Sequence, residues 1–178
     1  MNAGVSPGAD YIFRSSAWHV SCGTHVAVVE IEPITGHVRF LRYVVAHDAG
    51  RILNHQIVDG QVRGGVTQGV AGALLENLAY DEDGQLLSGS FIDYLLPTAV
   101  EAPEVEIHNI ETPSPHNPLG VKGAGEGGIL PTYAVVISAV EDATEARFDQ
   151  TPISPAQIAD SLHAAKNQIA VLAEAGRP

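Results

Sequence analysis

The first clear pattern in the chain is an alternation of apolar and polar residues across His25–Glu32. A second stretch, Val38–Ala46, is rich in β-branched residues and follows the short segment Pro33–Gly36. A repeat of two places every second side chain on the same face, which is typical of a strand with one buried face. The two stretches and the turn between them therefore predict a β-hairpin.

A different periodicity governs Gln56–Tyr80, where apolar residues recur every three or four positions and predict a helix. These apolar residues are Val62, Val66, Val70, Ala73, Leu74 and Leu78. The same segment contains glycine at positions 60, 64, 65, 69 and 72. Because a glycine inside a helix costs about 1 kcal/mol relative to alanine, we expect these glycines to permit close packing against another helix or a ligand.

The remaining segments predict two more strands and two more helices. Gln85–Leu96 and Val105–Ile110 are expected as strands, and Thr132–Glu145 is expected as a helix. The last helix is expected to begin with Ser154 as N-cap and Pro155 at its first position. An apolar stripe marks its buried side: Ile158, Leu162, Ala165 and Ile169.

Strands and helices are mixed along the chain without strict alternation. This order favours the α+β class, with a mixed sheet and helices packed on it. A chain of 178 residues is long enough for one domain with a substantial core. We expect a single domain over residues 1–178, in which residues 1–10 form an extended lead-in and residues 151–178 form a C-terminal helical cap.

Composition excludes several classes of function. The formal net charge of −12 argues against a nucleic-acid or anionic-membrane partner. Neither a signal-peptide pattern nor an apolar run of about 18 residues appears in the sequence, so we expect the chain itself to be neither exported nor membrane-spanning. The single cysteine, Cys22, excludes an internal disulfide and a cysteine-built metal site, and it is expected to be buried. The histidines lack metal-ligand spacing, so no metal site is predicted from side chains.

A glycine-rich loop, Asn117–Pro131, carries the candidate chemistry. It contains one carboxylate, Glu126, and one lysine, Lys122, among glycines at positions 120, 123, 125, 127 and 128. Glycine has no Cβ and lets another molecule approach the backbone closely. The loop is therefore interpreted either as a site for a ligand or as a tight turn that leads into the following helix.

Glu126 is the leading candidate for a catalytic residue. Among glycines and apolar residues its carboxylate is expected to be desolvated, which would make it a better general base. The alternative is an ordinary surface glutamate. Lys122 is expected to hold an anion, to pair with Glu126 or to be solvated. Gln61, at the front of the glycine-rich helix, either faces a ligand or has an ordinary capping or solvated role.

Several segments occur in an order and at separations that carry a family resemblance: Gly23–Glu30, Ala46–Asn54, Asp59–Gly69, Phe91–Pro97 and Leu119–Gly128. Together they resemble the C-terminal part of the molybdenum-binding subunit of the xanthine dehydrogenase, aldehyde oxidoreductase and carbon monoxide dehydrogenase family. The resemblance extends from about Tyr11 to Ala146. Several ordered motifs are far more specific than any one of them.

The resemblance implies a set of site residues. Glu126 matches the family's catalytic base beside the molybdenum, and Gln61 matches a glutamine that contacts the molybdopterin cofactor. The segment that matches backbone lying against the same site is Lys122, Gly123, Ala124 and Gly125. The implied reaction is hydroxylation of an aldehyde or an N-heterocycle, with water as the oxygen source. Carbon monoxide is not the expected substrate, because the members that use it carry a special loop in the other half of the subunit.

The resemblance also implies partners. Family molybdenum subunits are several times longer, so the molybdenum–molybdopterin cofactor is expected to be shared with an N-terminal half of the subunit. Iron–sulfur clusters and FAD are expected on partner subunits. The chain is therefore expected to be inactive alone. The expected compartment is the cytoplasm, or the periplasm where a partner carries the export signal.

Two other classes of function stay open. One is a structural or interaction protein that keeps the fold without binding a cofactor. The intact Gly-Ala-Gly-Glu segment and Gln61 argue against it, because a drifting sequence is expected to lose one of them. The other is a free-standing module that binds a small molecule, which would need a closed pocket of its own.

Overall fold

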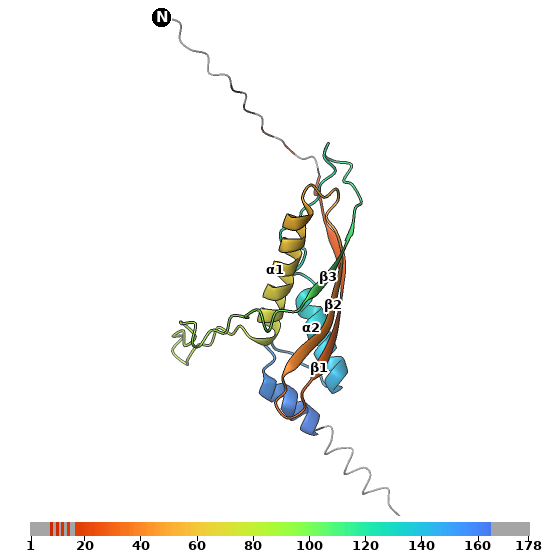
Figure 1. The fold of residues 1–178 in the computed structure, drawn as a ribbon. Coiled ribbons are helices and arrows are strands. Elements are labelled where there is room, and N and C mark those ends of the chain that lie inside the picture. Colours follow the sequence, from red (N-terminus) through yellow and green to blue (C-terminus); the bar gives the residue numbers. More distant parts are fainter. Residues whose placement is uncertain (1–7, 9, 11, 13, 15–16, 165–178) are drawn as a thin grey trace, which may run out of the picture.

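The computed structural model describes residues 8, 10, 12, 14 and 17–164. Its regular elements form two layers, a sheet and two helices packed on one of its faces (Figure 1). In chain order the elements are β1 (Cys22–Ile31), β2 (Val38–Asp48), α1 (His55–Leu74), β3 (Val105–Ile110) and α2 (Thr132–Thr144). Most of the predicted lead-in, residues 1–10, lies outside the described residues.

β1 and β2 form the predicted hairpin and pair antiparallel, with Gly23 opposite His47. Their turn contains Gly36 at a φ of 70°, a conformation that favours glycine. β3 pairs parallel with β2 on its other side, so the strand order is β1-β2-β3. A parallel pair needs a crossover connection, and α1 lies in it. One antiparallel and one parallel pair make the sheet mixed, which confirms the predicted α+β class.

α1 begins close to its predicted start and ends earlier than predicted. Asn54 is the N-cap, and its side-chain oxygen accepts a hydrogen bond of 3.2 Å from a backbone N–H of the first turn. The last helical residue is Leu74 rather than Tyr80. The N–H of Ile153 donates to the carbonyl oxygen of Ala73 at 2.8 Å. That carbonyl is therefore capped by another part of the chain where the helix ends.

The main core lies between the helices and the sheet. Its buried residues come from β2, α1, β3 and α2: Tyr43, Val45, Val62, Val66, Val70, Ala73, Val105 and Val136. A Cβ added at Gly65 would lie 2.8 Å from backbone of the glycine-rich loop, and one at Gly69 would lie 2.5 Å from Cβ of Thr132. These contacts confirm the predicted close packing. At Gly60 and Gly64 nothing lies within 4 Å of an added Cβ, so this part of α1 is open.

The two kinds of glycine predict opposite effects of alanine. We expect Gly69→Ala to lower the free energy of unfolding by about 1–3 kcal/mol, because Thr132 is fully buried and has little room to move. Gly64→Ala is the matched control in the same helix. It is expected to raise the free energy of unfolding by up to about 1 kcal/mol, because it meets no other atoms and improves helix propensity. Denaturant unfolding of both variants measures this, and equal effects would contradict the packing described.

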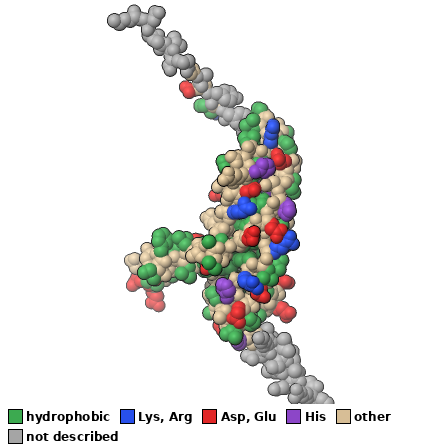
Figure 2. All heavy atoms as spheres, in the orientation of Figure 1, with side chains coloured by type: hydrophobic (Ala, Val, Ile, Leu, Met, Phe, Trp, Pro, Cys, Tyr) green, Lys and Arg blue, Asp and Glu red, His purple; other side chains and the backbone are tan. Residues whose placement is uncertain are grey.

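Residues 76–104, which we call the arm, extend away from the two layers (Figure 1). The predicted strand Gln85–Leu96 is wrong, because among the described residues this segment makes only an isolated bridge, between Tyr80 and Leu86. Its backbone has no neighbouring strand to pair with in this part of the chain. Apolar side chains gather over the arm in Figure 2: Leu78, Tyr80, Leu87, Phe91, Ile92, Leu95, Leu96 and Val100.

The last helix spans residues 155–164 in the described part of the chain. Ser154 caps it as predicted. The Ser154 N–H donates to Gln157 Oε1 at 2.9 Å, and the Gln157 N–H donates to Ser154 Oγ at 3.3 Å, which is a capping box. Ile158 is buried in a second small core, while Ala165 and Ile169 lie outside the described residues. None of the helices described is long and apolar enough to cross a membrane.

Candidate functional site

The glycine-rich loop lies against the first half of α1, where two predicted site segments meet. The Gln61 side-chain Nε2 donates to the carbonyl oxygen of Gly125 at 3.3 Å, across a separation of 64 positions. Gly128 rests directly on α1, because a Cβ there would lie 2.5 Å from the carbonyl oxygen of Val62. The fold therefore brings Gln61 next to the loop that carries Glu126.

Lys122 anchors one end of this loop through a buried ion pair. Its Nζ lies 2.9 Å from Oδ2 of Asp48, and the two side chains are 14% and 8% exposed. Lys122 thus holds an anion, but the anion belongs to the protein, which corrects the expectations of solvation and of pairing with Glu126. Burial alone would raise the pKa of Asp48. Hydrogen bonds from Lys122 and from the backbone N–H groups of Gly50 and Thr112 outweigh burial and hold that pKa well below its ordinary value.

A buried chain of hydrogen bonds anchors the other end of the loop. Thr132 Oγ1 donates to the carbonyl oxygen of Gly128 at 2.7 Å, and the Tyr43 hydroxyl donates to Thr132 Oγ1 at 3.1 Å. The Tyr43 proton is used in this bond. We therefore assign the proton of His25 to Nδ1, which lies 3.0 Å from the same hydroxyl. β1, β2 and α2 together hold this end of the loop.

His25 makes the stability of this arrangement depend on pH. Burial, with a smaller contribution from the neighbouring His47, lowers the pKa of His25 from 6.5 to about 4. Between these two values the unfolded chain binds a proton at His25 that the folded chain does not bind. The free energy of unfolding is therefore expected to fall by about 3 kcal/mol as the pH is lowered from about 6.5 to about 4. Above that window His25 contributes no pH dependence.

Chemical unfolding at a series of pH values measures this effect. The His25→Gln variant keeps a polar group near Tyr43 but does not titrate. It is expected to flatten the curve without removing the slope completely, because burial also lowers the pKa of His47. Parallel curves for the variant and the unchanged protein would mean that His25 is not the source of the pH dependence.

Glu126 is exposed in this chain, which corrects the expected burial of its carboxylate. The reason is local, because the flanking residues Gly125 and Gly127 have no side chains to cover it. The exposed residues of the first half of α1 and of this loop, which the contact between Gln61 and Gly125 joins, are together called the glycine face: Gly60, Gln61, Gly64, Gly123, Gly125 and Glu126. Water can be excluded from this carboxylate only by a second surface placed on the glycine face.

The glycine face fits a polar organic cofactor better than a metal ion held by side chains. No group of three His, Cys, Asp or Glu side chains that could hold a metal is found in the described part of the chain. A metal at this face would therefore need ligands supplied by a cofactor. The exposed backbone at Gly123 and Gly125 allows close approach. The Gln61 amide and the Glu126 carboxylate add a donor and acceptors.

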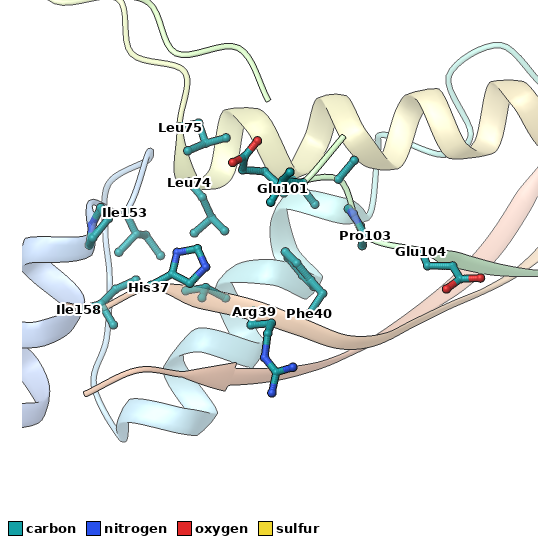
Figure 3. Close-up of a pocket in the computed structure, with 16 residues that line it drawn as sticks. His37, Arg39, Phe40, Leu74, Leu75, Glu101, Pro103, Glu104, Ile153 and Ile158 are labelled. Atoms are coloured by element: carbon teal, nitrogen blue, oxygen red, sulfur yellow. The ribbon is translucent and has the colours of Figure 1, made fainter. Parts of the chain in front are cut away.

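A separate cavity lies at the C-terminal end of α1 (Figure 3). It has a volume of about 170 Å³. Most of its wall is apolar and comes from β2, α1, the base of the arm and the segment around the last helix, including Val38, Phe40, Val70, Leu74, Ile153 and Ile158. None of the predicted site residues lines it. The candidate chemistry therefore belongs to the glycine face and not to this cavity.

The residues that hold the loop were not predicted as site residues. Asp48 and its neighbour His47 fall inside the segment Ala46–Asn54, and membership of that motif was their only signal in the sequence. Tyr43 and Thr132 carry no sequence signal beyond apolar periodicity nearby. Cys22 is exposed at the start of β1, which corrects its predicted burial.

Comparison with known proteins gives concordant findings. Residues 8–103 match the family model described as the molybdopterin cofactor-binding domain. The chain is 44% identical to the nicotine 6-hydroxylase large subunit of Paenarthrobacter nicotinovorans, over 79% of this chain and 18% of that subunit. It is 36% identical to the carbon monoxide dehydrogenase large chain of Hydrogenophaga pseudoflava, over 76% of this chain and 17% of that protein.

Solved structures similar to this chain include oxidoreductases of the same kind. Quinoline 2-oxidoreductase from Pseudomonas putida 86 superposes with a TM-score of 0.75 at 40% identity, over 79% of this chain and 18% of that one. The chain thus spans less than a fifth of the length of the curated relatives quoted above, at 18% and 17%. The glycine-rich loop lies beyond the range matched by the family model, residues 8–103.

Proposed function

Because the chain belongs to the family of molybdopterin-binding large subunits, we propose that it forms one wall of the cofactor site of a molybdenum hydroxylase. The observation that carries the proposal is the hydrogen bond between Gln61 and Gly125. This contact brings a candidate cofactor ligand, open glycine backbone and the Glu126 carboxylate onto one surface. The glycine face is the surface on which the molybdopterin would bind.

The parts of the glycine face have distinct roles in this proposal. The Gln61 amide binds a polar edge of the molybdopterin. The backbone of Gly123, Ala124 and Gly125 lies against the same cofactor, since glycine offers no side chain to hold it away. Lys122 belongs to this segment, but its side chain acts indirectly, because its ion pair with Asp48 fixes where the backbone runs. The molybdenum itself is held by the cofactor.

Glu126 is the general base of the proposed reaction. Hydroxylation replaces a C–H bond of the substrate by a C–OH bond with oxygen from water, and it releases two protons and two electrons. The cofactor, when bound, supplies the redox chemistry and takes up both electrons. Glu126 accepts a proton from the attacking oxygen, a role for which a carboxylate near the reacting atoms is suited. Covering the glycine face excludes bulk water from this step.

The names of two relatives support one of the two substrate classes considered. Nicotine 6-hydroxylase and quinoline 2-oxidoreductase are named for reactions on N-heterocycles. An electron-poor ring carbon beside nitrogen is a suitable target for hydroxylation by water. We therefore favour an N-heterocycle over an aldehyde as the substrate.

The proposal requires partner chains. The remaining part of the large subunit would cover the glycine face and supply further cofactor contacts, and iron–sulfur and FAD subunits would carry the electrons away. The relatives are named as a large subunit and a large chain, which supports a multi-subunit enzyme. The chain alone is expected to be inactive, because Glu126 and the glycine face stand open to water. The proposed compartment is the cytoplasm, or the periplasm if a partner carries an export signal.

The arm supplies a surface for such a partner. Phe91 and Ile92 are 81% and 87% exposed, and neighbouring apolar residues extend the surface along the arm (Figure 2). Large contiguous apolar patches on a protein surface mark interfaces. We therefore assign the arm to the contact with the rest of the large subunit.

Purification of a tagged chain from its native cells tests this assignment. The unchanged chain is expected to bring down a larger polypeptide at a fixed ratio. The Phe91→Asp/Ile92→Asp double variant is expected to lose most of it, because two charges would be buried without partners at the interface. The matched control is Ile34→Asp, at an equally exposed position in the hairpin turn, where Ile34 is 79% exposed. Full recovery of the partner with the double variant would refute the role of the arm.

A further inference from the structure

A buried histidine lies directly beneath the loop that carries Glu126. His47 is the last residue but one of β2, and the alternation of that strand turns it inward with Tyr43 and Val45. His47 is only 1% exposed. The next residue, Asp48, holds Lys122 at one end of the loop. The end of β2 therefore contacts the loop through two consecutive side chains.

The imidazole of His47 lies between two glycines. A Cβ added at Gly127 would clash with Cε1 of His47 and would lie 3.2 Å from Nε2 and 3.3 Å from Nδ1. On the hairpin side, a Cβ added at Gly23 would lie 2.9 Å from the carbonyl oxygen of Ala46 and 3.4 Å from Nδ1 of His47. The ring therefore occupies the space that a side chain at Gly127 would fill, and it is in van der Waals range of a side chain at Gly23. The Gly127 backbone rests on the edge of the ring that contains Cε1 and both nitrogens.

Both ring nitrogens of His47 are buried and have no hydrogen-bond partner among the described residues. Burial also lowers the pKa of His47, so the ring is neutral and carries one N–H donor and one bare acceptor. A buried polar group without a partner is destabilising, and an aliphatic side chain of similar size would avoid that effect. Such a group in the core calls for an explanation in terms of what it contacts when the site is complete.

We propose that His47 is a positioning residue for Glu126: its imidazole supports Gly127, and its ring N–H forms a hydrogen bond to a loop carbonyl oxygen when the site is assembled. This inference rests on the proposed function of Glu126. Both nitrogens lie close to the position that a Cβ at Gly127 would take, so the peptide groups of this turn are the candidate partners when the loop shifts. His47 does not touch the cofactor or the substrate. It acts by fixing the turn on which the carboxylate stands.

Two substitutions in the assembled enzyme test whether His47 positions the turn at Gly127 through its ring nitrogens or only fills space. His47→Leu fills the space without nitrogens, and His47→Asn restores one N–H donor. We expect His47→Leu to keep its molybdenum content and its KM and to lower kcat by at least about tenfold, because small displacements of a catalytic group reduce rate strongly. Hydrogen–deuterium exchange of the peptide covering residues 119–130 is expected to speed up. His47→Asn is expected to recover part of both losses.

Other outcomes would overturn the proposal. An unchanged kcat and unchanged loop exchange in His47→Leu, with higher thermal stability, would make His47 a filler only. Loss of molybdenum in that variant would assign it to cofactor retention instead. If His47→Leu does not assemble, Gly127→Ala provides the second test, because its Cβ displaces the same ring, and a normal kcat in it would also refute the proposal. The exchange measurement does not depend on molybdenum, so it tests His47 even if the unchanged complex contains none.

Discussion

The Glu126→Gln variant of the assembled enzyme is expected to keep its molybdenum and to lose turnover by at least about a hundredfold. A positioned general base contributes a factor of this order or more, and glutamine has nearly the same shape without the ability to take up a proton. The Glu126 side chain is exposed in the chain itself, so its replacement is not expected to disturb folding. Steady-state turnover of an N-heterocycle, divided by the molybdenum content, measures the effect.

Glu145→Gln is the matched control for this substitution. Glu145 is exposed as well and lies at the opposite end of α2 from the glycine face. It is expected to turn over at the normal rate. If Glu126→Gln also stays within about twofold to threefold of the unchanged enzyme, Glu126 is not the base.

The second large effect is expected at the anchor of the loop. Lys122→Met leaves the Asp48 carboxylate buried without its cationic partner. Removing one member of a buried ion pair typically lowers the free energy of unfolding by about 3–5 kcal/mol. The side chains of Lys122 and Asp48 are only 14% and 8% exposed, so this pair is close to a fully buried ion pair. Because the same pair fixes the backbone of the glycine face, we also expect the variant to retain less molybdenum.

Two controls identify the origin of this loss. The double variant Asp48→Asn/Lys122→Met leaves no buried charge and is expected to recover most of the stability. Arg42→Met breaks the surface pair with Glu106, whose side chains are 61% and 43% exposed, and is expected to change stability by less than about 1 kcal/mol. Denaturant unfolding compares the three. Equal losses in Lys122→Met and Arg42→Met would contradict a special role for the buried pair.

Short-range sequence patterns predicted those elements whose conformation is set by neighbouring residues. The alternation of the hairpin stretches, the segment Val105–Ile110 and the capping residue Ser154 each correspond to an element close to its predicted bounds. In these cases the burial of one face and the nearby turn residues decide the conformation. The glycines of α1 also predicted close packing, and Gly65 and Gly69 show it.

The wrong predictions concern segments whose conformation depends on contacts with residues far away in the sequence. α1 ends at Leu74, where the N–H of Ile153 caps the carbonyl oxygen of Ala73, and no periodicity in the helix signals that contact. The arm contains β-forming residues such as Phe91 and Ile92, but it has no neighbouring strand among the described residues. Its exposed apolar residues are those that we assign to an interface, and a sequence pattern alone cannot distinguish such a surface from a buried strand.

The sequence nominated residues for the candidate site, but it did not indicate what holds the glycine-rich loop in place. Glu126 and Gln61 were chosen from glycine content and family resemblance, and the fold brings Gln61 to the loop. The partner of Lys122 lies 74 positions away at Asp48, beyond any local pattern. The desolvation expected for Glu126 is absent in this chain, because the flanking residues Gly125 and Gly127 have no side chains to cover its carboxylate.

Metal analysis of the complex purified through this chain tests the central claim most directly. The chain should be recovered from its native cells with a larger partner, and molybdenum should be present at a constant ratio to the chain across the peak of a sizing column. Iron in the same peak would identify the electron-transfer subunit. A chain that elutes alone and free of molybdenum, under conditions where it is folded, would contradict the assignment of the glycine face as a cofactor site.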